Sequence, residues 1–185
     1  MAHGIFRLPT PVNEPIFEYR PGSPERKALQ AKLKELAAKE IEIPLVIGGE
    51  KVRTGKTGDA RCPHDHAHLL GRYEKAGAKE VASAIAASQK AWPEWSRMSW
   101  EDRASIFLRA ADLLAGPYRQ VLNAATALGQ SKTCHQAEID AACELIDFWR
   151  FNVAFGRKLL AEQSISSPGV WNRLDHRPLE GFVYA

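Results

Sequence analysis

The longest helical pattern in this chain is T-C-H-Q-A-E-I-D-A-A-C-E-L-I-D-F-W-R-F-N-V-A-F-G-R-K-L-L-A, residues 133–161. The segment contains no proline, and its single glycine lies near the far end. At about 100° per residue, one face repeats at the i, i+4, i+7 spacing of an amphipathic helix. That predicted face comprises Ala137, Ala141, Leu145, Phe148, Asn152, Phe155 and Leu159. We therefore predict one long helix over 133–161.

Glu144 falls in the middle of this predicted apolar face, whereas Glu138 and Asp147 project well away from it. An ionised carboxylate costs several kcal/mol to desolvate unless a cation, hydrogen-bond donors or a ligand compensates it. Two interpretations follow. Glu144 either reaches the rim of the face or pairs with an arginine, or it binds a cationic group of a ligand.

The composition excludes several classes of protein. With 185 residues, 45% apolar and 25% charged, the chain is typical of one globular domain or a domain and a half. Its net charge of +3 is mild, and basic and acidic residues are interspersed, so no nucleic-acid partner is expected. No apolar run reaches the roughly 18 residues of a membrane span, and no secretory signal is evident. Three cysteines, Cys62, Cys134 and Cys143, fit a reducing, intracellular compartment.

Local signals predict the other elements. Four prolines make residues 1–22 an extended arm. Ser23 and Pro24 begin a helix that reaches about residue 39, and Gly48-Gly49 is a two-residue hairpin signal. Further helices are predicted over 79–92, ending at Pro93, over 99–116 and over 117–129. After the long helix, 170–185 show strand alternation, and an apolar strand begins at 182–185.

The segment C-P-H-D-H-A-H, residues 62–68, contains a possible metal-binding set. If the backbone were extended, Cys62, His64, His66 and His68 would point to the same side, as zinc ligands could. The spacing differs from the usual structural zinc patterns, and Pro63 and Asp65 favour a turn-rich loop over 53–71. We therefore expect solvated histidines in a loop and no metal.

Six motifs run through the chain in order. They are N-E-P-I at 13–16, G-S-P-E-R at 22–26, I-P-L-V-I-G-G at 43–49, R-A-S-I-F-L-R-A-A-D-L-L-A-G-P at 103–117, G-Q-S-K-T-C-H-Q-A-E-I-D-A-A-C-E-L-I-D-F-W-R-F-N at 129–152 and P-L-E-G-F-V-Y-A at 178–185. Together they resemble the N-terminal part of the aldehyde dehydrogenase family, and within it the enzymes that oxidise glutamate γ-semialdehyde.

The resemblance implies an α/β protein: the N-terminal part of the aldehyde dehydrogenase fold, mostly helical in this segment, with a β-hairpin and the start of an oligomerisation flap. Residues 1–22 would be an extended arm, and 23–163 the helical and hairpin part of the NAD-binding domain. Residues 164–185 would be the start of the flap and of a truncated core strand. The implied reaction is NAD-dependent oxidation of L-glutamate γ-semialdehyde, formed from pyrroline-5-carboxylate, to L-glutamate in proline catabolism.

The resemblance also implies where the site residues lie. The family's nucleophilic cysteine, general base, oxyanion asparagine and NAD-binding loops all lie beyond residue 185, so we expect no catalytic, NAD-binding or metal-binding residue in this chain. In similar proteins the glutamate at the position of Glu144 binds the α-ammonium group of the substrate. Phe148, one turn on, is expected to line the same pocket, although an aromatic residue at that spacing is also typical of a core.

The expected partners are a small-molecule substrate and, in the full-length protein, further copies of the same chain as a dimer or higher homo-oligomer. Neither nucleic acid nor a membrane is expected. The location would be the cytoplasm of a bacterium, or the mitochondrial matrix of a eukaryote. Two alternatives stay open: a noncatalytic helical module that binds a partner, and a fragment of another aldehyde dehydrogenase.

Overall fold

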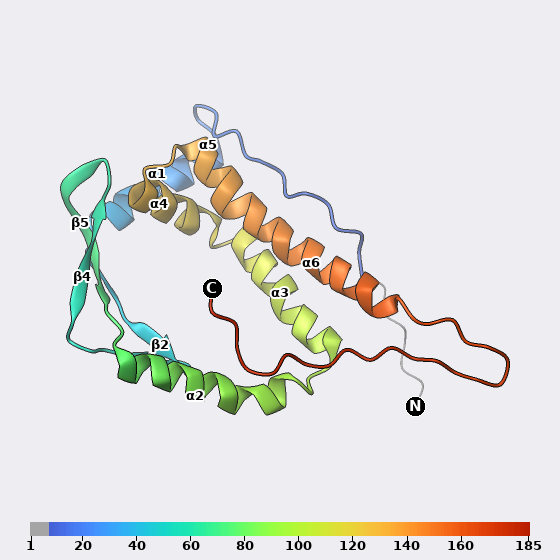
Figure 1. Ribbon diagram of the computed structural model, residues 1–185. Helices are drawn as coiled ribbons and strands as arrows, with labels where there is room; N and C mark the ends of the chain where they lie inside the picture. Colours follow the sequence, from blue (N-terminus) through green and yellow to red (C-terminus); the bar gives the residue numbers. More distant parts are fainter. Residues whose placement is uncertain (1–7) are drawn as a thin grey trace.

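The computed structural model describes residues 8–185, and helices dominate it (Figure 1). The helices are α1 (Pro24–Ala37), α2 (Ala78–Trp95), α3 (Trp100–Ala115), α4 (Arg119–Gln130), α5 (Cys134–Gln136), the π-helix η1 (Ala137–Cys143) and α6 (Glu144–Ala161). The strands are β1 (Ile41–Ile43), β2 (Leu45–Ile47), β3 (Glu50–Val52), β4 (Thr57–Cys62) and β5 (Asp65–Glu74). The mixture confirms the predicted α/β class.

Three serine and threonine caps begin helices where the sequence predicts. The hydroxyls of Ser23, Ser99 and Thr133 accept the backbone N–H of the residue three positions on. Two predicted ends are wrong. α2 continues past Pro93, because the N–H of Ser96 still reaches the carbonyl of Trp92 at 2.8 Å and closes the last turn. α4 continues past Gly129 and ends at Gln130, where Ser131, with a positive φ, is the C-cap.

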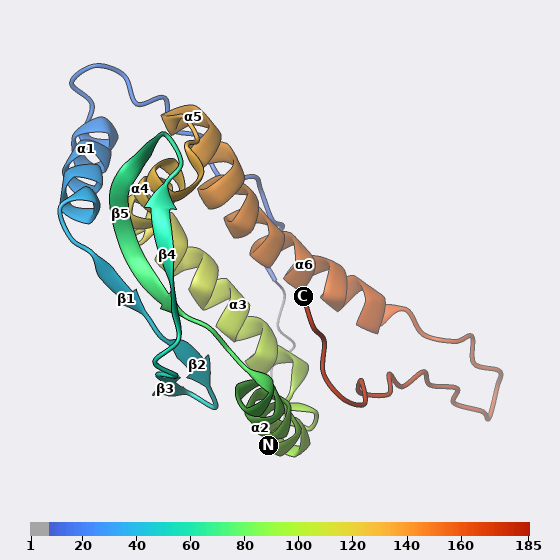
Figure 2. The same ribbon diagram turned by 60° about the vertical axis from the view of Figure 1, so that its left-hand side comes forward.

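Helix α3 lies beside the long helix over much of its length in both views (Figures 1 and 2). Their contact buries the main apolar cluster, formed by Ala111, Leu114, Ala142 and Ile146. A second buried cluster, formed by Tyr19, Leu29 and Ala124, joins the N-terminal arm and α1 to α4. The arm is therefore packed into the same helical layer.

The predicted hairpin at residues 45–52 is confirmed: β2 and β3 pair antiparallel around Gly48 and Gly49, which both have positive φ. The predicted loop over 53–71 is wrong, because β4 and β5 form a second antiparallel hairpin, with β1 parallel to β5. Pro63 lies in the two-residue turn between Cys62 and Asp65, where its missing N–H breaks no bond between the strands.

One continuous helix over Cys134–Ala161 confirms the central prediction, but it contains a π-helical turn, η1. The amide N–H of Glu144 bonds the carbonyl of Ile139, five residues earlier instead of four. A turn of this kind takes in one extra residue. Every side chain beyond it therefore changes face relative to a uniform α-helix.

The predicted apolar face of the long helix is wrong for this reason. The buried positions Ala142, Ile146 and Val153 each lie one residue later than a predicted one. The side chains predicted to be buried there lie outside instead: Phe148 is 59% exposed and Phe155 is 55% exposed. Glu144 is also exposed, so its carboxylate carries no burial penalty in this chain.

The arm and the C-terminal segment are both extended. Residues 8–20 follow the long helix in both views, and residues 1–7 of the predicted arm lie outside the described part (Figures 1 and 2). Residues 162–185 leave α6 without forming the predicted strands, because no strand elsewhere in residues 8–185 pairs with their backbone. Trp171 is 83% exposed there. No helix within residues 8–185 is long and apolar enough to cross a membrane.

Candidate functional site

The two residues that the sequence selects, Glu144 and Phe148, line one open groove of about 370 Å³ along α6. We call it the anionic groove; it is lined by Asn13, Glu144, Asp147, Phe148, Phe151, Asn152 and Phe155. Six of these residues lie within α6, and one belongs to the arm. Two carboxylates among three aromatic rings are suited to an organic cation, because ring faces and carboxylates both attract positive charge.

The two carboxylates of the groove have different surroundings. Asp147 accepts two hydrogen bonds from the arm, from Asn13 Nδ2 at 2.7 Å and from the backbone N–H of Glu14 at 2.7 Å. Within residues 8–185, no hydrogen-bond or ion-pair partner reaches the carboxylate of Glu144. Glu144 is therefore the carboxylate of the groove that is free to bind a ligand.

The fully buried carboxylate of this helix is Glu138, which sequence reasoning missed. Its side chain pairs with Arg119, and it accepts hydrogen bonds from the phenol of Tyr19 and the amide of Asn123, each at 2.7 Å. The backbone N–H of Phe17 donates to it at 2.8 Å. Helical periodicity could not reveal this site, because the partners come from the arm and from α4.

Arg119 connects this buried site to the arm. Its Nη1 lies 2.5 Å from Glu14 Oε1, and its Nη2 donates to the carbonyl of Pro15 at 2.6 Å. The guanidinium carbon lies 3.9 Å from the ring centroid of Phe17. One cation thus holds three contact points of the arm against the helices.

The protonation of this buried cluster follows from its hydrogen bonds. Burial favours a higher pKa for Glu138, but the bonds from Arg119, Phe17 and Tyr19 outweigh it and lower the pKa below its ordinary value. Burial, together with the carboxylate of Glu138, raises the pKa of the Tyr19 phenol. Glu138 is therefore ionised and Tyr19 neutral at neutral pH, and the cluster is structural.

None of the three cysteines has the surroundings of a nucleophile. Burial and the nearby Glu138 raise the pKa of Cys143 to about 11, and burial raises the pKa of Cys134. Cys62 is 1% exposed. A reactive thiol needs an accessible sulfur and a lowered pKa, so these residues are better explained as parts of the packed interior.

The histidines of residues 62–68 contact different parts of the chain. His64 contacts the sulfur of Cys62 at 3.2 Å and the hydroxyl of Ser131 at 2.8 Å, whereas His68 Nε2 contacts the carbonyl of Ala37 at 2.9 Å. In the described part of the chain, no three His, Cys, Asp or Glu side chains are grouped as metal ligands. His68 and His64 instead tie the β4–β5 hairpin to α1 and to the end of α4, respectively.

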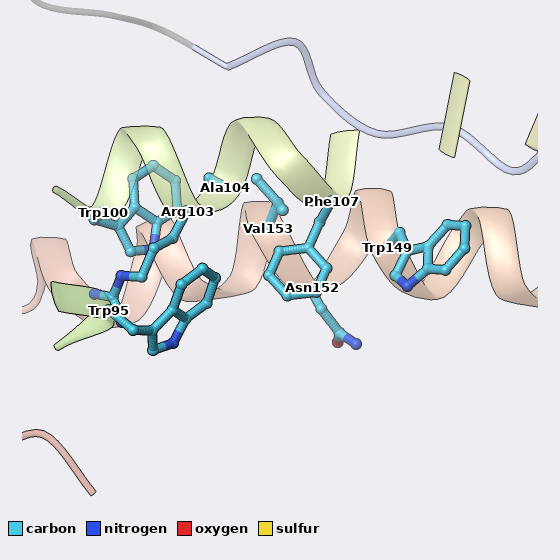
Figure 3. A pocket seen from close by; sticks show the side chains of 8 residues that line it. All are labelled: Trp95, Trp100, Arg103, Ala104, Phe107, Trp149, Asn152 and Val153. Atoms are coloured by element: carbon cyan, nitrogen blue, oxygen red, sulfur yellow. The ribbon is translucent and has the colours of Figure 1, made fainter. Parts of the chain in front are cut away.

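A second hollow, of about 320 Å³, lies between α3 and α6 (Figure 3). Trp95, Trp100 and Arg103 gather at one end of it, and Trp149 lies at the other. Its remaining lining is Ala104, Phe107, Asn152 and Val153. With no carboxylate, thiol or histidine among its lining residues, it has no group suited to acid–base or nucleophilic chemistry.

Comparison with known proteins assigns the chain to a family. A curated relative, the delta-1-pyrroline-5-carboxylate dehydrogenase of Agaricus bisporus, is 48% identical over 97% of this chain and 33% of its own length. The mitochondrial protein of that name from Bos taurus is 46% identical over 94% of this chain and 31% of its own. The chain thus spans about a third of the length of the curated relatives that it matches.

Two solved structures have the same fold. One is the Delta-pyrroline-5-carboxylate dehydrogenase of Mycobacterium tuberculosis, solved with NAD and cobalamin. It is 51% identical, the match covers 98% of this chain and 34% of the length of that protein, and the TM-score is 0.95. The 1-pyrroline-5-carboxylate dehydrogenase from Thermus, solved with bound NAD, matches 89% of this chain and 32% of its own at 28% identity, with a TM-score of 0.79. The sequence profile of the aldehyde dehydrogenase family matches residues 51–185. Because that match covers well over half of the sequence, the chain belongs to the aldehyde dehydrogenase family.

Proposed function

We propose that this chain is the N-terminal part of a delta-1-pyrroline-5-carboxylate dehydrogenase, which oxidises L-glutamate γ-semialdehyde to L-glutamate with NAD. The names of the relatives support this assignment. So does the anionic groove, whose free carboxylate suits a substrate that carries a fixed positive charge. The alternatives, a noncatalytic partner-binding module and a fragment of another aldehyde dehydrogenase, have no comparable support.

Glu144 carries the proposal. Its carboxylate would bind the α-ammonium group of the semialdehyde, while the rings of Phe148 and its neighbours in the groove would cover the carbon chain. Fixing the charged end of a short molecule also fixes the direction of its aldehyde end, which is how a noncatalytic residue contributes to the rate.

The chemical step belongs to residues outside this segment. NAD, when bound, accepts the hydride that leaves the substrate carbon. The sequence Gly-Gln-Ser-Lys-Thr at 129–133 shares its Gly and Ser-Lys-Thr with a phosphate loop, but it ends α4, leads into the long helix and follows no strand, so we place NAD binding elsewhere in the protein. Residues 23–163 are proposed to form the helical and hairpin part of the NAD-binding domain, and on its own the segment would be inactive.

The proposal extends to assembly and location. Residues 164–185 would begin a flap that pairs with another subunit of a homo-oligomer and a core strand, since the apolar side chains of Ile165, Trp171 and Tyr184 are largely exposed. We infer a cytoplasmic enzyme in a bacterium, or a mitochondrial one in a eukaryote.

The deciding experiment replaces Glu144 by glutamine in the full-length enzyme. Losing a hydrogen bond to a charged group should raise the KM for the semialdehyde about 10- to 100-fold, with the KM for NAD within about twofold of the wild type. Glu162→Gln, an exposed glutamate just after the same helix, is the matched control and should change neither constant. Unchanged semialdehyde kinetics in Glu144→Gln would remove Glu144 from the site.

A further inference from the structure

Asn13 is the residue of the anionic groove that does not belong to the long helix. It comes from the extended arm, which lies along α6 in both views (Figures 1 and 2). Nothing in its local sequence marks it as a ligand contact. Its position depends entirely on how the arm is attached.

The carboxamide of Asn13 has a fixed orientation. It lies 2.7 Å from Oδ2 of Asp147, and an ionised carboxylate can only accept. The amide nitrogen must therefore face Asp147, which leaves the amide oxygen as the free acceptor. Within residues 8–185, no donor is bonded to that oxygen.

The backbone on the C-terminal side of Asn13 is also held. The N–H of Glu14 donates to the other oxygen of Asp147 at 2.7 Å. The carboxylate of Glu14 is clamped between Arg119 and Arg150, each 2.5 Å away. Arg119 is buried and paired with Glu138, so it cannot follow the arm, and sliding the arm along the helix would break the ion pair between Glu14 and Arg119. Asn13 is thus preorganised before any ligand arrives.

We propose that Asn13 is a specificity-determining residue, whose amide oxygen accepts a hydrogen bond from the same ammonium group that Glu144 binds. This inference rests on the proposed function of the groove. An ammonium group has three N–H donors, so one carboxylate leaves donors unsatisfied. The amide oxygen of Asn13 is neutral, so it can accept from the ammonium group without adding repulsion with the carboxylate of Asp147. An aldehyde without the amino group would bond neither acceptor, so Glu144 and Asn13 together would favour amino aldehydes over aldehydes that lack the amino group.

The test compares two substrates on one preparation of full-length enzyme: glutamate γ-semialdehyde and the five-carbon aldehyde acid that lacks the amino group. The ratio of their kcat/KM values measures selectivity and is independent of the fraction of enzyme that is folded. Asn13→Ala should lower this ratio about tenfold, mainly through the KM of the amino aldehyde, with the KM for NAD unchanged. Val12→Ala, a change at the adjacent exposed position, should leave the ratio as in the wild type.

Asp147 acts through Asn13 as a positioning residue, which a double mutant can show. Asp147→Ala alone should lower the selectivity ratio, and adding it to Asn13→Ala should lower the ratio little further, because the group that it orients is already gone. Full additivity of the two changes would overturn this part of the proposal.

The outcomes separate this inference from the proposed function. If Glu144→Gln lowers the selectivity ratio and Asn13→Ala does not, Glu144 binds the ammonium alone and the role of Asn13 is overturned. An equal fall of both kcat/KM values in Asn13→Ala would reduce Asn13 to an attachment point of the arm. If neither variant changes the ratio, the groove is not the ammonium site and the proposed function of Glu144 fails with it.

Discussion

Arg119 and Glu138 form an ion pair that is almost completely withdrawn from solvent, with side-chain exposures of 2% and 0%. The pair joins α4 to the π-helical turn; further hydrogen bonds tie it to Glu14, Pro15 and Phe17 of the arm, and Asn123 of α4 also donates to Glu138. A buried charge is tolerated only when its partner and its hydrogen bonds are all present. The pair therefore makes the arm and the two helices depend on one another.

Replacing Glu138 by glutamine should destabilise this region strongly. The change leaves Arg119 buried with one carboxylate fewer, and breaking a buried pair costs about 3–5 kcal/mol. We expect hydrogen exchange of the α4 amides in the full-length enzyme to report a decrease of this size in the free energy of local opening. Asp140→Asn, which removes the exposed pair with Lys132, is the control and should cost less than about 1 kcal/mol. Equal costs for the two variants would contradict the assigned role of Glu138.

The stability of the same region should depend on pH in acid. The pKa of Glu138 in the folded state lies below its ordinary value of about 4.5, so its stabilisation is complete above that pH. It should disappear as the pH falls through the folded-state pKa. The free energy of local opening, corrected for intrinsic exchange, should fall below about pH 4.5 in the wild type. In Glu138→Gln this part of the pH dependence should be absent; a fall of equal size in the variant would assign it to other groups.

The hydrogen bonds that attach the arm should be lost one at a time when single acceptors are removed. In Asp147→Ala, the amide of Glu14 loses its acceptor, whereas the amide of Phe17 keeps Glu138. Amide exchange should therefore accelerate at least about tenfold at Glu14, with little change at Phe17. Loss of protection at both amides would mean that the arm docks as a single unit.

The extra residue of the π-helical turn should be dispensable for the register of the helix. Deleting Asp140 removes the extra residue, so the turn can close as an ordinary α-helix with Glu138, Ile146 and Val153 still on one face. Asp140→Ala removes the same side chain and keeps the chain length, so it is the matched control. We expect the deletion to melt within about 2 °C of Asp140→Ala. A loss of about 2–5 kcal/mol, as when a packed site is emptied, would show that the register is lost.

Helix starts are predictable from the sequence because they depend on nearest neighbours. Ser23, Ser99 and Thr133 are capping residues whose partners lie three positions away, and the structure shows each bond. The hairpin at Gly48-Gly49 is equally local. Strands β4 and β5 are not predictable from local sequence. The histidines and Pro63 are typical of a loop, whereas the pairing of the two strands joins residues up to 17 positions apart, from Thr57 to Glu74.

The structure changes the reason for which Glu144 stands out. Periodicity marks Glu144 as a carboxylate on a buried face, but the π-helical turn puts that face outside, where it becomes a groove. Glu144 and Phe148 both line the groove, and their role in binding substrate stays a prediction. Asn13 and Glu138 could not be found from periodicity, because their partners lie on other segments.

The contact between Asn13 and Asp147 spans 134 residues of sequence. At a synthesis rate of about 5–20 residues per second, the arm leaves the ribosome on the order of ten seconds before the helix that will hold it. During that interval its exposed Val12, Ile16 and Phe17 have no α6 to pack beside. The arm, which is made before the long helix, can therefore dock only after that helix has emerged, and only then does Asn13 become part of the groove.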